Sequence, residues 1–84
     1  MPPKMKQLIL EQEEQKIFKE FEKLGYEVRQ GKILGQSQVI IENDWLEIVI
    51  YKYEGTYRVW RGSVPIKIHQ LLNKLFKLWG WFDE

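Results

Sequence analysis

Few side chains in this sequence combine the type and the spacing that catalysis requires. The single histidine, His69, stands between Ile68 and Gln70 in a segment with helical periodicity. No carboxylate lies three or four residues from it, so nothing on the same helix would position it as a general base. Ser37 and Ser63 have no basic partner nearby in sequence. We therefore expect no enzymatic activity.

Metal binding is equally unsupported by the residue pattern. Cysteine is absent, which removes thiolate ligands, thiol nucleophiles and disulfides. The clearest cluster of oxygen-bearing side chains is Glu42-Asn43-Asp44, and a turn accounts for it because Asn and Asp favour turns. We expect no metal site, no cofactor and no small-molecule substrate.

The passage from the first helical pattern into residues 24–28, Leu-Gly-Tyr-Glu-Val, resembles the opening of the restriction-endonuclease-like fold. That resemblance implies a metal-dependent site with an acid on one strand and an acid-x-lysine sequence on the next. Asp44 and Lys52 match two of these positions, but Ile50 stands where the family has its metal-binding acid. This departure removes the catalytic implication.

Two amphipathic helices are expected at the two ends of the sequence. The first is predicted over residues 6–24, because apolar side chains recur at helical spacing and Gly25 suits the left-handed position that ends a helix. The second is predicted to begin at Ser63 as N-cap, with Pro65 tolerated in its first turn, and to end near Gly80.

Three antiparallel strands are predicted between Ser37 and Arg61. Two-residue turns at Asn43-Asp44 and Glu54-Gly55 place the aliphatic side chains of both hairpins on one face, and a slip of one residue would destroy that agreement. The segment from Gly31 to Gly35 is expected to be a loop. Counting outward from the turns gives the pairs Ile41–Leu46, Val39–Ile48, Ile40–Glu47, Glu42–Trp45, Ile50–Val59, Tyr51–Arg58 and Val49–Trp60.

The predicted fold is α+β, in the order helix, three-stranded antiparallel meander, helix, with both helices mainly on the aliphatic sheet face. A short extra strand over residues 26–30 is left open. The 84 residues form one domain spanning 1–84, with residues 1–7 expected to be flexible. The apolar run near the N-terminus is too short for a signal peptide and no run would cross a bilayer, so we expect a cytoplasmic protein without a membrane partner.

The back of the predicted sheet is the main candidate for a working surface. A sheet with one buried face normally carries polar residues on the other face. Because large apolar patches are uncommon on free monomers, we expect this face to bind a protein partner, most simply a second copy in a homodimer. The alternative is that the N-terminal segment, Trp81-Phe82 or a helix covers it within the chain. The predicted set is Ile40, Trp45, Val49, Tyr51, Tyr53, Arg58 and Trp60.

A basic stripe on the last helix is the second candidate surface. Its spacing places three lysines on one side of the helix, close after an arginine, where they would contact the phosphates of DNA or RNA together with Arg58. The order of elements also resembles the double-stranded-RNA-binding domain, although that family's lysine cluster at the start of its second helix is reduced here to Lys67. The stripe consists of Arg61, Lys67, Lys74 and Lys77.

Charge favours a protein over a nucleic acid as the partner. The formal net charge is +1, which provides no bulk attraction to phosphate. Glu42 and Glu47 are expected on the aromatic face, where a sheet that binds RNA would carry cations instead. Nucleic-acid binding therefore remains the alternative to protein association.

Overall fold

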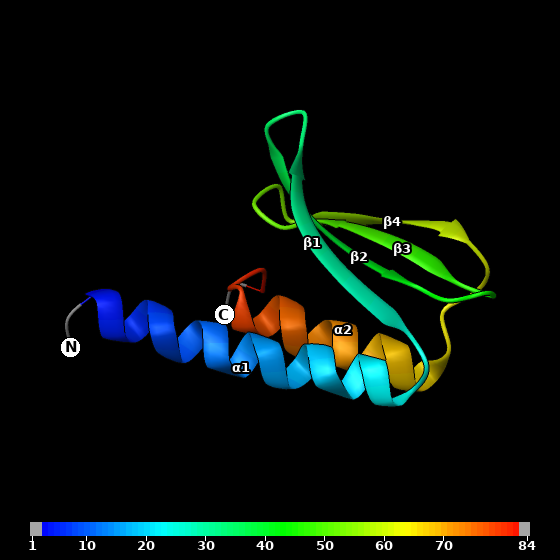
Figure 1. Cartoon of the computed structure of the whole chain (residues 1–84), viewed down its shortest axis with the longest axis horizontal. Helices are drawn as coiled ribbons and strands as arrows, with labels where there is room; N and C mark the ends of the chain where they lie inside the picture. Colours follow the sequence, from blue (N-terminus) through cyan, green and yellow to red (C-terminus); the bar gives the residue numbers. More distant parts are fainter. Residues whose placement is uncertain (1–2, 83–84) are drawn as a thin grey trace.

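The protein folds as a four-stranded antiparallel sheet with two helices on one face. The computed structural model describes residues 3–82, and the side chains of residues 7–82. The strand order is β1-β2-β3-β4, and Figure 1 shows the helices side by side beneath the sheet. The predicted α+β arrangement is confirmed, and the segment left open at 26–30 belongs to a fourth strand. The elements are α1 Pro3–Lys23, β1 Glu27–Ile33, β2 Gln36–Glu42, β3 Glu47–Tyr51, β4 Thr56–Arg61 and α2 Ile66–Leu78.

Both helices end in the same backbone motif. After α1, Gly25 adopts a φ of 93°, and the N–H groups of Gly25 and Tyr26 donate to the carbonyls of Glu22 and Phe21. This pattern is a Schellman motif, in which a left-handed residue lets the chain satisfy the last carbonyls of the helix. Gly80 plays the same part after α2, with a φ of 78°. The predicted ends of both helices are therefore confirmed.

The beginnings of the helices differ from the prediction. The first helix starts at Pro3, three residues before the expected position. The second starts at Ile66, with Pro65 in extended conformation as the N-cap residue and no side-chain hydrogen bond at the cap. Ser63 is therefore not the N-cap, because Gly62, Ser63 and Val64 form the connection that brings the chain from the sheet to the helix layer.

The segment around Gly31 is a strand and not the loop that its glycines suggested. β1 and β2 pair along their full length, from Glu27 opposite Glu42 to Ile33 opposite Gln36. Leu34 and Gly35 form the two-residue turn between them, with φ values of 54° and 81°. Positive φ at both central residues is the type I′ geometry that matches the twist of paired strands.

The two central hairpins have longer turns than predicted. Ile41 lies opposite Ile48, and Ile48 lies opposite Val59, so both registers differ from the predicted ones by two residues. The turns span residues 43–46 and 52–55. Because side chains alternate with a period of two, a shift of two residues changes partners and preserves faces. The predicted division of the sheet into two faces therefore holds.

The core lies between the aliphatic face of the sheet and the two helices. Tyr57 joins this face, and its ring lies 5.3 Å from that of Phe76. The Trp81 ring stacks on that of Phe76, with the ring centres 4.1 Å apart, and its indole N–H donates to the carbonyl of Lys52. The fully buried side chains are Phe21, Val39, Ile41, Leu46, Ile48, Ile50, Ile68, Leu72 and Leu75.

A buried ion pair joins α1 to the turn between β3 and β4. The residue Glu14 is 7 % exposed, and its carboxylate accepts a hydrogen bond of 2.9 Å from Lys52 Nζ and one of 2.6 Å from Trp79 Nε1. The ammonium group also lies 5.2 Å from the centre of the Trp79 ring. One carboxylate thus connects α1, the sheet and the end of α2.

Neither α1 nor α2, within the part of the chain that the structure describes, is both long and apolar enough to traverse a lipid bilayer.

Candidate functional site

The face of the sheet opposite the helices is organised in cross-strand rows. Arg29, Ile40, Val49 and Arg58 lie next to one another across β1, β2, β3 and β4. The row therefore has an apolar centre and an arginine at each edge. In Figure 1 neither helix lies on this face, which we call the open face.

The neighbouring row towards the β2–β3 turn is acidic across three strands. It consists of Glu27, Glu42 and Glu47 on β1–β3, with Arg61 completing it on β4. The row on the other side is uncharged and consists of Gly31, Gln38, Tyr51 and Thr56. Counted over the three rows, three glutamates face three arginines, so the open face has no net charge.

Two of the arginines pair with glutamates within the chain. The guanidinium of Arg29 bonds to the Glu42 carboxylate, and that of Arg61 lies 3.4 Å from Glu47. Among the described residues Arg58 takes part in no ion pair. The open face therefore offers one cation without a partner in the described chain, next to an apolar centre.

The apolar centre is compact and partly covered by its own neighbours. Val49 is only 8 % exposed although it points away from the helices, while Ile40 and Tyr51 are half-buried. Trp60 is 60 % exposed and has no cross-strand partner, because the register of β3 and β4 shifts by one residue between Glu47 and Ile48. This bulge gives Trp60 an exposed position beside the centre.

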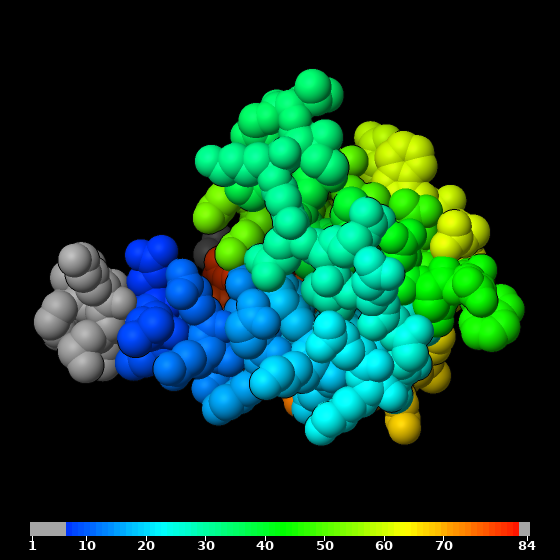
Figure 2. Space-filling view, in the orientation of Figure 1, coloured from blue at the N-terminus to red at the C-terminus, as the bar shows by residue number. Residues whose placement is uncertain are grey.

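The structure brings together five of the seven residues predicted for this face and separates the other two. Trp45 lies in the β2–β3 turn, 78 % exposed, and Figure 2 shows this turn as a projection from the body of the molecule. Tyr53 lies in the β3–β4 turn, on the side that faces α1. Both residues were assigned to strands only because the turns were predicted two residues too short.

The predicted phosphate-binding set is also divided. Lys67, Lys74 and Lys77 line grooves between α1 and α2 on the outer surface of the helix layer. Lys16 and Lys23 of α1 line the same grooves, which gives five lysines against Glu13 and Glu20. Arg61 is held at the sheet by Glu47 and by the carbonyl of Asn43, and Arg58 lies on the open face.

Sequence reasoning missed two sets of residues that the fold brings together. Arg29 lies on the open face because β1 is a full strand. The alternation of Val28, Arg29 and Gln30 is the signal that could have placed Arg29 on the face opposite Val28. Glu14 forms the buried pair with Lys52, and its signal was a carboxylate that interrupts the apolar stripe of α1.

Within residues 3–82 no group of three or more His, Cys, Asp or Glu side chains is arranged to hold a metal ion, and His69 lies exposed on α2. No protein-family model, curated protein or solved structure matches the chain.

Proposed function

We propose that the chain is a small, non-enzymatic interaction module that associates with a second copy of itself through the open face. The observation that carries the proposal is the exposed Trp60 beside an apolar centre, on a sheet face that neither helix covers. Surfaces of this kind, apolar in the middle and charged at the rim, are typical of protein interfaces.

Charge supports a second copy as the partner. The face carries equal numbers of carboxylates and guanidinium groups in adjacent rows. Another molecule of the same chain therefore presents an acidic row that can pair with Arg58. A phosphate backbone would meet three glutamates and no net positive charge, which disfavours it at this surface.

The size of the face predicts weak association. Four strands about 4.8 Å apart, with five to seven residues at about 3.4 Å each, give a flat area of about 330–460 Å² per copy. The two copies together would bury about 650–900 Å², a figure for flat faces that omits the additional surface of protruding side chains. Transient complexes lie below about 1,200 Å², so we expect an exchanging dimer and not an obligate one.

Sedimentation velocity over a wide concentration range, up to millimolar protein, tests this proposal. The parent chain is expected to change from monomer to dimer as concentration rises. Trp60→Glu and Tyr51→Glu are each expected to remain folded monomers, because each places a carboxylate against the apolar centre of the partner. The matched control is Trp45→Glu, which makes the same chemical change in the β2–β3 turn and should associate like the parent.

Three results would contradict the proposal. One is a parent chain that stays monomeric throughout the range. The second is association that Trp60→Glu and Tyr51→Glu leave unchanged while circular dichroism shows both folded. The third is a loss of association in Trp45→Glu equal to that in Trp60→Glu, which would move the interface to the turn.

The two grooves between the helices support nucleic-acid binding as a second candidate function. Together they are lined by five lysines from two helices and by two glutamates, of which Glu13 is paired with Lys16 at 3.1 Å. Fluorescence titration of labelled DNA and RNA at two salt concentrations tests it. Binding that weakens with salt and is reduced in Lys74→Gln would support this function, and absence of binding at low salt would exclude it.

A further inference from the structure

A pocket of about 530 Å³ opens on the side of the molecule away from the open face. Its walls come from the N-terminal half of α1, from β1, from the β3–β4 turn and from the end of α2. In Figure 2 red atoms from the C-terminal end of the described chain are visible between the N-terminal half of α1 and the strands. The volume suits a small organic molecule.

The base of the pocket holds the buried carboxylate of Glu14, of which only one oxygen accepts hydrogen bonds. Both hydrogen bonds that Glu14 accepts, from Lys52 and from Trp79, end on Oε2. Among the described residues Oε1 has no hydrogen-bond partner, and no fully buried side-chain oxygen is left without one. Oε1 is therefore accessible from the pocket that Glu14 lines.

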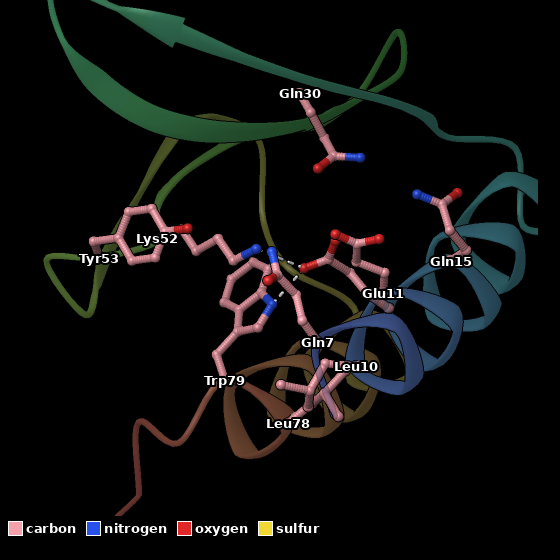
Figure 3. Close-up of a pocket in the computed structure, with 10 residues that line it drawn as sticks. Gln7, Leu10, Glu11, Gln15, Gln30, Lys52, Tyr53, Leu78 and Trp79 are labelled. Carbon is pink, nitrogen blue, oxygen red and sulfur yellow. Dashed lines mark hydrogen bonds and ion pairs between the residues drawn. The ribbon is translucent and has the colours of Figure 1, made fainter. Parts of the chain in front are cut away.

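Further polar groups converge on the same space. Figure 3 shows Gln15 of α1 and Gln30 of β1 pointing toward each other, with the Glu11 carboxylate between them and the base of the pocket. Gln7 adds a third amide. Acceptor oxygens are thus available from two carboxylates and three amides, around walls formed by Leu10, Leu78 and the ring of Trp79.

Charge determines which ligand such a pocket can take. Glu11 and Glu14 supply two negative charges and Lys52 one positive charge, so the lining carries a net charge of −1. Phosphates and carboxylates would be repelled. A group with one positive charge and several N–H donors would satisfy the free oxygens of Glu11 and Glu14 together.

We infer that this pocket is a binding site for a small organic cation, with a guanidinium or ammonium group held by Glu11 and by Oε1 of Glu14. The aliphatic part of the ligand packs against Leu10 and Leu78. The site is separate from the open face, so its occupancy and self-association are tested independently.

The test uses two probes of the same shape and different charge, butylguanidinium and butylurea. The parent chain is titrated with each, and ¹H–¹⁵N spectra follow the indole N–H of Trp79 and the side-chain amides of Gln15 and Gln30. We expect butylguanidinium to cause saturable chemical-shift changes. The affinity for butylurea should be at least about tenfold lower, because a hydrogen bond between two charged groups contributes more than one between a carboxylate and a neutral group.

Glu11→Gln is expected to weaken butylguanidinium binding by about tenfold while leaving the spectrum otherwise native, since Glu11 is exposed. Glu13→Gln is the matched control, because Glu13 lies on the same helix, pairs with Lys16 and does not line the pocket. The inference is overturned if butylguanidinium gives no saturable shift, if butylurea binds equally well, or if Glu11→Gln binds like Glu13→Gln.

Discussion

Replacing Glu14 by leucine and Lys52 by methionine, singly and together, measures what the buried ion pair contributes to stability. Each replacement roughly keeps side-chain volume, so cavity formation contributes little. The Glu14 side chain is 9 % exposed and that of Lys52 is 25 % exposed. A charge left without its partner in this setting is costly, because water reaches it poorly.

The expected magnitude follows from that burial. Removing one partner of a fully buried pair costs about 3–5 kcal/mol, and the partial exposure of Lys52 lowers the estimate here to about 2–4 kcal/mol for each single variant. A chain of 84 residues has a free energy of unfolding of about 4–13 kcal/mol. Either single variant should therefore melt about 10–25 °C below the parent.

The double variant separates an electrostatic effect from a packing effect. With both charges removed, the remaining loss of unfolding free energy is about 1–2 kcal/mol, mainly because the Trp79 N–H no longer has an acceptor. The double variant should therefore lose less free energy of unfolding than the sum of the two single losses. The difference, the coupling energy, should be at least about 2 kcal/mol. Urea unfolding followed by circular dichroism gives all four free energies.

Glu13→Gln is the control for this cycle, because it removes an exposed carboxylate from the same helix and should cost less than about 0.5 kcal/mol. A Glu14→Leu variant that is no more destabilised than this control would contradict the prediction. So would a double variant whose loss equals the sum of the two single losses, because additivity would mean that Glu14 and Lys52 do not interact.

Two glycine-containing sites give further predictions. Gly62→Ala should lower the free energy of unfolding by about 2–5 kcal/mol, because φ is 83° and a Cβ would lie 1.9 Å from the carbonyl oxygen of Trp45. Gly35 has a similar φ, but nothing lies within 4 Å of an added Cβ, so Gly35→Ala should lower the free energy of unfolding by only about 1–2 kcal/mol. Equal losses in the two variants would show that the close approach of Gly62 to Trp45 is unimportant. Leu34→Asn should raise stability by up to about 1 kcal/mol in thermal unfolding, since Leu34 is 98 % exposed at a φ that Asn tolerates better; a lower melting temperature would contradict this.

The faces of the sheet could be predicted from the sequence, whereas its registers could not. Alternation of aliphatic and other residues fixes a face whatever the partner strand is, so Ile41, Ile48 and Val59 were placed correctly. Register depends on turn length, and Asn43 closes a longer turn than its sequence suggested. Its side-chain oxygen accepts hydrogen bonds from the N–H groups of Trp45 and Leu46, which draws both residues out of β3.

The candidate site was predicted in part for the same reason. Ile40, Val49 and Arg58 share a row because all three lie within strands, where alternation is reliable. The Arg29–Glu42 pair could not be foreseen without β1, and the Arg61–Glu47 pair depends on the register of β3 and β4, which the predicted turn length misplaced. The contact between Glu14 and Lys52 spans 38 residues of sequence and depends on how α1 docks on the sheet, which no local pattern encodes.

The simple strand order has a consequence for how the chain folds. Every strand pairs with its neighbour in sequence, so the sheet can form hairpin by hairpin without closing a long loop. The contact of α1 with α2 instead joins segments that are separated in sequence by all four strands. Forming it closes a loop that contains β1–β4, and the entropic cost of closing a loop rises with its length. We expect substitutions in the hairpins to slow folding and substitutions between the helices mainly to accelerate unfolding, a division that the two limbs of a chevron plot would display.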